Sequence, residues 1–252
     1  MTHQRRGLLA ALALAAFLTV PATASAQAAN DPMEPVNRGI FWFNDKLDVF
    51  LLEPLAKGWN FIVPEFVQTG IGRIFDNAQT PIYLVNNLLQ GDPGGAGHTL
   101  GRFVVNTTVG FGGFADPASD LGLQAHREDF GQTFGVWGLG TGPYLMLPVL
   151  GPSSVRHGVG RILDAPLRVW PFFVGPVEYY VILGTEAVNT RAGLLEPIAT
   201  AKETSLDYYA FVRDAYTQRR AALVANMDPD AADDAGDEDL YYFDEEESDG
   251  GL

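Results

Sequence analysis

The sequence predicts an all-α protein, a single domain of short, kinked helices. Apolar residues recur every three or four positions over long stretches, whereas the strict alternation typical of half-buried strands is scarce. Asp-Pro and Thr-Pro pairs precede these stretches and glycine clusters follow them, as expected at helix starts and ends. The 252 residues include 28 Gly and 16 Pro, and 47% are apolar while only 19% are charged. This composition favours one sizeable domain with a poorly charged interior.

The helix boundaries can be placed from local signals. The first helix is predicted to begin at the Asp-Pro-Met-Glu run from position 31, with the aspartate accepting from an early helix N–H, the proline at the first helical position and the glutamate completing a capping box. Pro54 and Pro64 are expected to kink or break the following stretch. A second helix is expected between Thr80 and the glycines of 91–95, and a last one after Ser205.

The two ends of the chain differ from its body, which predicts three segments. Residues 1–26 contain two arginines, an apolar run of thirteen residues and an Ala-Ser-Ala site, typical of a cleaved signal peptide. The alternative is an uncleaved membrane anchor, although a span requires about twenty apolar residues. The body, residues 27–226, holds 14 bases and 19 acids, so it shows no basic footprint for nucleic acid.

Residues 227–252 hold twelve acids and no base. Like charges at this density repel one another and bury little surface, which predicts a solvated, disordered tail. The alternative is that the apolar run at 240–243 orders on a basic partner.

A stretch of 26 residues without charge, from Phe130 to Val155, is the most informative part of the body. It is long enough to cross a bilayer. Six glycines and three prolines interrupt it, however, and a lipid-exposed span so interrupted would leave backbone groups unpaired. We expect two short helical arms around a turn at residues 147–152. The stretch belongs either to a protein that sits in a membrane without a conventional span, or to an unusually apolar soluble core.

No catalytic set can be assembled, so we predict that the protein is not an enzyme and needs no cofactor. The absence of Cys excludes a thiol enzyme, a disulfide scaffold and a zinc-thiolate site. Ser153 lies in a Pro/Gly turn without the strand–turn–helix context of a hydrolase nucleophile. The ligand-type residues of 126–129 are adjacent and do not share a helix face, so no metal is expected there. Glycines 138, 140 and 142 do not match a nucleotide-binding motif.

Polar side chains flank the apolar stretches instead. Arg102 and Asn106 lie one helical turn apart, Asp129 and Gln132 lead into the longest stretch, and Arg161 follows it. Ion pairs that close helix ends explain most of these positions. The alternative is a narrow polar path beside apolar walls, because a lipid phosphate requires cations and hydrogen-bond donors while acyl chains require only apolar surface.

At these residues the sequence resembles the VacJ/MlaA family, the outer-membrane component of the pathway that maintains lipid asymmetry. The resemblance runs in order across almost all of residues 30–223. The matching segments are DPMEPVNRGIFWFNDKLD, PLAKGWNFIVPEFVQTGI, NNLLQGDP, LGRFVVNTTVGFGGFADPA, HREDFGQTFGVWGLGTGPYLMLPVLGPSSVR and SLDYYAFVRDAYTQRR.

The resemblance implies a ring-like domain in the periplasmic leaflet of the outer membrane, with a central amphipathic channel. Phospholipid mislocalised to the outer leaflet would pass through the channel to a soluble periplasmic carrier of the MlaC type, beside a trimeric porin and upstream of an inner-membrane ABC transporter. The segment 31–48 would form the first ring helix, and residues 143–152 would form the loop that controls the channel. The expected channel and hairpin residues are Arg102, Asn106, Gln132, Tyr144, Leu147, Pro148, Leu150 and Pro152. The expected carrier contacts are Tyr209, Arg213, Arg219 and Arg220.

One departure from the family pattern concerns the anchor. Family members are commonly acylated on a Cys after the signal, and this sequence contains none, so we expect an outer-membrane protein without a lipid anchor. Attachment would then depend on an apolar belt, the porin or an uncleaved signal. The alternative function is that of a soluble periplasmic lipid-binding or scaffold protein, whose apolar stretches are simply its core.

Overall fold

The computed structural model describes residues 31–226, and the predicted all-α class is confirmed, with one small hairpin added. The predicted signal peptide and acidic tail lie outside the described residues. The elements are α2 (Glu34–Leu47), η2 (Asp48–Leu52), α3 (Glu53–Ile62), α4 (Glu65–Ala78), α5 (Thr80–Gln90), α6 (Pro93–Thr108), α7 (Pro117–Asp120), α8 (Phe130–Val136), β1 (Tyr144–Leu147), β2 (Gly151–Ser154), α9 (Val155–Asp164), η3 (Ala165–Leu167), α10 (Trp170–Phe173), α11 (Pro176–Gly193), α12 (Leu195–Thr204) and α13 (Tyr208–Val224).

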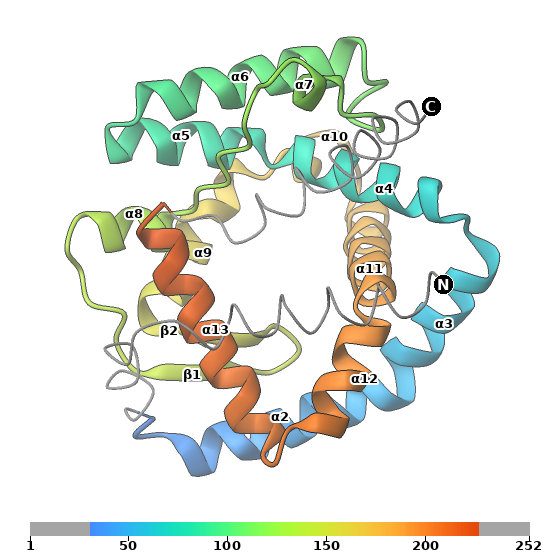
Figure 1. Ribbon diagram of the computed structural model, residues 1–252, viewed down its shortest axis with the longest axis vertical. Coiled ribbons are helices and arrows are strands. Elements are labelled where there is room, and N and C mark those ends of the chain that lie inside the picture. The colour runs from blue at the N-terminus through green and yellow to red at the C-terminus, as the bar shows by residue number, and fades with distance from the viewer. Residues whose placement is uncertain (1–30, 227–252) are drawn as a thin grey trace, which may run out of the picture.

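The elements follow one another around a ring (Figure 1). Helices α2, α3 and α4 form one arc, α5 and α6 the next, and α8, α9, the hairpin and α13 the third, while α11 and α12 run back to the first arc (Figure 1). None of the described helices is both long enough and apolar enough to cross a bilayer.

Ion pairs tie the returning helices to the first arc. Arg191 on α11 is buried and donates from Nε and Nη2 to the two carboxylate oxygens of Asp48, at 2.6 and 3.0 Å. Lys202 on α12 lies 2.8 Å from the carboxylate of Asp45. A buried guanidinium that lost its carboxylate would be left uncompensated, so these pairs hold the ring closed.

The start of the first helix differs from the predicted capping box. Helix α2 begins at Glu34, and Met33 precedes it without a side-chain cap. The Asp31 carboxylate instead accepts from Asn37 Nδ2 at 2.8 Å and from the Tyr209 hydroxyl. The prediction was wrong because donors from the folded ring, one of them 178 residues away, take the place of the local N–H.

The prolines of the first arc behave differently from each other. Pro54 lies in the first turn of α3, and the helix continues into it through the π-helical turn η2. The wider π turn relieves the clash between a proline ring and the preceding turn, so the chain bends without stopping. Pro64 follows the end of α3 and precedes the first residue of α4, as expected of a break. The predicted limits of α5 are confirmed, since Gly91 ends it in the left-handed conformation at φ 77°.

The expected helical arms around residues 147–152 are wrong. Only Phe130–Val136 is helical, and the turn joins two antiparallel strands in which Tyr144 pairs with Ser154 and Leu147 with Gly151. Val149 and Gly151 take positive φ values of 66° and 75° at the turn. Glycines and prolines shorten the arms below the length at which a helix is stable alone, and side chains of α2 supply the hydrogen bonds that the strand edge needs.

Burial in this fold is the reverse of that in a typical soluble domain. The largest fully buried side chains are polar: Asn37, Asn86, Asn87, Thr133, Ser153 and Ser154. Large apolar side chains lie exposed on successive arcs, with Phe50 77%, Phe61 91% and Phe173 82% exposed. A soluble monomer rarely exposes so many large apolar side chains to this degree, so the ring is suited to contact with a membrane or a partner.

Candidate lipid-binding cavities

Two polar cavities adjoin each other and share the side chains of Tyr83 and Arg127. The first, here the α4–α6 cavity, has a volume of about 560 Å³ and lies among α4, α5, α6 and α11. The second, here the α9–α13 cavity, has a volume of about 420 Å³ and lies among α5, α8, the hairpin, α9 and α13. Among the described residues, no group of three His, Cys, Asp or Glu side chains could hold a metal ion.

Arginines dominate the α9–α13 cavity. Its charged lining consists of Arg127, Arg161, Arg168, Arg219 and Arg220 against Glu128, Asp129 and Asp164. Five guanidinium groups face three carboxylates, so the cavity carries a surplus of positive charge. Such a lining is suited to an anionic ligand.

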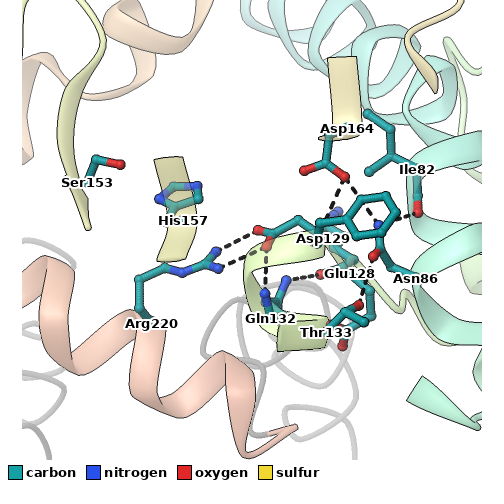
Figure 2. Close-up of polar contacts among 12 residues, drawn as sticks. Ile82, Asn86, Glu128, Asp129, Gln132, Thr133, Ser153, His157, Asp164 and Arg220 are labelled. Atoms are coloured by element: carbon teal, nitrogen blue, oxygen red, sulfur yellow. Dashed lines mark hydrogen bonds and ion pairs between the residues drawn. The ribbon is translucent and has the colours of Figure 1, made fainter. Parts of the chain in front are cut away.

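Close packing of two glycines brings the walls of this cavity together. A Cβ added to Gly160 on α9 would lie 2.4 Å from the backbone nitrogen of Gly131 on α8, nearer than any side chain tolerates. The two helices therefore touch through their backbones. This contact sets the start of α8, where Asp129 lies, against the face of α9 that carries His157 and Asp164 (Figure 2).

The ion pair between Asp129 and Arg220 joins α8 to α13. Two guanidinium nitrogens of Arg220 donate to the two oxygens of Asp129 at 2.6 and 2.9 Å, and Asp129 also accepts from Gln132 N at 2.8 Å as the cap of α8 (Figure 2). Burial opposes ionisation of Asp129, but the Arg220 guanidinium outweighs it and lowers the pKa of the carboxyl.

A second carboxylate lies deeper, in a network of neutral donors. Asp164 is 5% exposed and accepts from Asn86 Nδ2 at 3.2 Å and from Phe130 N at 3.3 Å (Figure 2). Thr133 in turn donates to the Asn86 side-chain oxygen at 2.7 Å. Burial, with repulsion from Asp129, raises the pKa of Asp164 to about 6.

His157 lies on the same wall of the cavity. Its ring stacks on Tyr216, and Nδ1 is 3.1 Å from the Tyr216 hydroxyl. Burial lowers the pKa of His157 to about 4, and the nearby charges of Arg220 and Arg161 act in the same direction. At neutral pH the imidazole is therefore uncharged and adds nothing to the positive surplus.

The α4–α6 cavity contains the predicted pair Arg102 and Asn106, but both side chains are already engaged. Arg102 donates to Asp116 at 2.6 Å and to the carbonyl of Leu123 at 2.6 Å. Asn106 donates to the same aspartate at 2.7 Å and accepts from Ala118 N at 3.0 Å. Both side chains line the cavity, and their bonds to Asp116 and Ala118 connect α6 to the start of α7. These contacts agree with the expectation that ion pairs at helix ends explain most of the polar positions.

Only part of the predicted hairpin set reaches a cavity. Leu150 and Pro152 line the α9–α13 cavity, together with the predicted Gln132. Tyr144 is instead buried in the small apolar cluster with Met146 and Tyr209. Leu147 and Pro148 line neither cavity. The channel role of the predicted residues stays a prediction, with Leu150, Pro152 and Gln132 in the positions that suit it.

Two asparagines on α2, two turns apart, hold the hairpin in place. Asn37 donates to the Tyr144 carbonyl at 3.0 Å and accepts from Met146 N at 2.9 Å. Asn44 donates to the Leu147 carbonyl at 2.9 Å and accepts from Val149 N at 2.8 Å. Sequence reasoning missed both. The sequence pattern that could have indicated them is a pair of asparagines seven residues apart, which places both amides on one otherwise apolar face of the helix.

The predicted carrier contacts on α13 do not share one environment. Tyr209 is 3% exposed and packs in the apolar cluster, so its ring does not offer surface to a soluble partner. Arg220 is engaged with Asp129, and Arg219 lines the α9–α13 cavity. Arg213 donates to the neighbouring Asp214 at 2.9 Å. Carrier contact stays a prediction. Of the four predicted residues, Tyr209 suits this role least, because its side chain is buried.

Comparison with known proteins agrees with this architecture. A family model described as "MlaA lipoprotein" matches residues 29–223. The chain belongs to the MlaA lipoprotein family. This match spans nearly all of the described ring, including both cavities and the hairpin.

Curated relatives and a solved structure share most of the chain. The "Intermembrane phospholipid transport system lipoprotein MlaA" of Shigella flexneri is 36% identical over 223 residues, which cover 84% of this chain and 86% of the relative. The protein of the same name from Escherichia coli (strain K12) is 35% identical with the same coverage. A solved structure described as "Structural basis for maintenance of bacterial outer membrane lipid asymmetry" has 34% identity and a TM-score of 0.69, covering 77% of this chain and 98% of its own.

Proposed function

We propose that this protein transports phospholipid between membranes and thereby maintains the lipid asymmetry of the outer membrane. Mislocalised phospholipid leaves the outer leaflet through the interior of the ring and passes to a soluble periplasmic carrier. One observation carries the proposal: many large apolar side chains are exposed on the ring, while the α9–α13 cavity is lined mostly by polar residues and is rich in arginine. The names of the relatives support the same role.

The apolar surface supports a position in the periplasmic leaflet. Exposed aromatic and aliphatic side chains follow the ring from its first arc to α11: Phe50, Phe61, Ile62, Phe66, Phe172, Phe173 and Val177. Each transfer of such a side chain from water to lipid is worth about 1.5–3 kcal/mol, whereas a single acyl chain gives only marginal binding. These exposed apolar side chains are therefore sufficient to retain the ring in the membrane without acylation of a Cys.

The cavities supply a path for the headgroup beside the lipid-facing wall. Acyl chains need only apolar surface, while the phosphate needs donors and positive charge. Leu150 and Pro152 line the α9–α13 cavity, which supports a role for the hairpin in opening or narrowing this path. A trimeric porin beside the ring and a carrier of the MlaC type at α13 complete the proposal, and their support is the family resemblance.

The decisive experiment measures phospholipid on the cell surface with externally added phospholipase. A strain lacking the gene should expose more phospholipid than the parent, and restoring the gene should reverse the increase. Unchanged surface phospholipid in the deletion strain would refute the transport role.

The alternative of a soluble periplasmic scaffold makes the opposite prediction about extraction. A membrane-embedded ring should leave the membrane fraction only with detergent and should carry phospholipid. A scaffold should remain soluble without detergent. The exposed rings of Phe50, Phe61 and Phe173 favour the first outcome.

A further inference from the structure

Four of the five arginines of the α9–α13 cavity fall into two groups by their partners. Arg220 is paired with Asp129, and Arg127 lies 3.0 Å from the carboxylate of Asp76. Arg161 and Arg168, in contrast, have no ion pair or hydrogen bond of their side chains within residues 31–226. These two guanidinium groups are therefore available to a ligand in the cavity.

The side chain of Arg161 is also poorly satisfied. Its Nη1 is buried and has no hydrogen-bond partner in the described part of the chain. Burial lowers the pKa of Arg161, and repulsion from Arg168 acts in the same direction. A buried N–H without an acceptor is costly, and an anion that entered the cavity would offset this cost.

A buried acceptor lies in the lining of the same cavity. Gln132 is 3% exposed and its Nε2 donates to the Arg127 carbonyl at 2.9 Å, while its Oε1 has no hydrogen-bond partner among the residues that the structure describes. The cavity therefore combines unpaired cationic donors with one unpaired neutral acceptor. That combination matches a ligand that carries an anion and, close to it, a donor group.

The choice of arginine over lysine agrees with a phosphate ligand. The three lysines of the chain, Lys46, Lys57 and Lys202, line neither cavity, and each lies next to a carboxylate. Arginine presents a planar fork that binds two phosphate oxygens at once and is less strongly hydrated than an ammonium group. A cavity that needed only positive charge would have no such preference.

We propose that Arg161 and Arg168 bind the phosphate of a phospholipid headgroup during transit, while Gln132 Oε1 accepts a hydrogen bond from the headgroup's hydroxyl or ammonium. This subsite rests on the proposed transport function and names the group that the ring recognises. The three nearby carboxylates limit the affinity, which suits a site that must also release its ligand.

The test measures binding of short-chain lipids to the full chain in detergent. The probes are dihexanoylphosphatidylglycerol, dihexanoylglycerol, which lacks the phosphate, and inorganic phosphate. The wild type should bind the phosphate-bearing lipid at least tenfold more tightly than either other probe. In R161Q/R168Q this preference should fall at least tenfold, whereas K57Q, which removes an exposed positive charge, should leave it unchanged.

Further variants separate binding from folding. R168Q alone removes a half-buried side chain that makes no hydrogen bond or ion pair with the described residues, so it should fold normally and still lose part of the preference. R161K/R168K retains the charge without the fork and should bind with intermediate affinity. Equal binding of both lipids by the wild type, or unchanged binding by R161Q/R168Q, would overturn the subsite, and inorganic phosphate bound as tightly as the lipid would overturn its assignment to a headgroup.

The cell-surface assay keeps this proposal distinct from the transport function. If the wild-type gene restores low surface phospholipid and R161Q/R168Q does so equally well, the subsite is wrong while transport stands. If the wild-type gene has no effect on surface phospholipid, the transport function fails regardless of the variants.

Discussion

Replacing Asn37 with alanine tests the idea that polar side chains of α2 hold the hairpin in the ring. Asn37 is 1% exposed and bridges the carbonyl of Tyr144 and the N–H of Met146, at 3.0 and 2.9 Å. The substitution leaves both backbone groups buried without a partner, and each such group costs about 1–3 kcal/mol. The bond to Asp31 is lost as well. We expect Asn37→Ala to lower the free energy of unfolding by about 3 kcal/mol.

The measurement combines denaturant unfolding in detergent with hydrogen exchange at the Met146 amide. Because this amide donates to Asn37, its exchange should accelerate by about 100-fold in the variant. Asn60→Ala is the matched control, since Asn60 is exposed and makes a single bond of 3.3 Å to the carbonyl of Ala192. The control should change stability by less than about 0.5 kcal/mol. If Asn37→Ala matched this control, or if Met146 stayed protected, the reasoning would be refuted.

The remaining predictions concern the walls of the α9–α13 cavity. Gly160→Ala should destabilise the protein by about 2 kcal/mol because its Cβ meets α8, whereas Gly158→Ala in the same helix, with its nearest contact at 3.8 Å, should be neutral or slightly stabilising in thermal unfolding. Folded His157 has a pKa of about 4, below its unfolded value of about 6.5, so its contribution to stability is lost as the pH falls between these values, whereas Asp164, with a folded pKa of about 6, acts in the opposite direction. His157→Gln should therefore gain stability relative to the wild type when unfolding is measured at pH 4.5 instead of pH 7. Leu150→Asp should raise surface phospholipid while leaving the melting temperature nearly unchanged, because Leu150 is exposed at the hairpin tip; an equal loss of fold would identify it as a core position.

The placement of polar residues distinguishes this ring from a soluble helical domain. In a soluble domain apolar side chains fill the interior and polar ones face water. Here amides and hydroxyls such as Asn86, Thr133 and Ser153 are fully buried where elements meet, while several aromatic rings, among them Phe61 and Phe173, are exposed. Hydrogen bonds can hold helices together in contact with lipid, where apolar contacts between helices give little advantage over contacts with acyl chains.

Local sequence signals located most helices but not the hairpin. Thr80-Pro81 and Gly91 marked both ends of α5, because capping and left-handed termination depend on residues within one or two turns. The same rules wrongly predicted that Asp31 caps the first helix and that helices flank the turn at 147–152. In both cases partners on distant elements decided the outcome, the Tyr209 hydroxyl for Asp31 and the amide of Asn37 for β1.

The sequence by itself determined the helical class, the absence of thiol chemistry, the uncharged glycine- and proline-rich stretches and the family. It also predicted Gln132, Leu150 and Pro152 as channel or hairpin residues, and these three line the α9–α13 cavity. Only the tertiary structure decided which polar groups line a cavity and which connect helices. Arg220 and Asp129, 91 residues apart, pair with each other, while Nη1 of Arg161 has no hydrogen-bond partner among residues 31–226. The physical reason is that periodicity and capping report neighbours along the chain, whereas the cavity is formed by closure of the ring, which brings together residues that share no local signal.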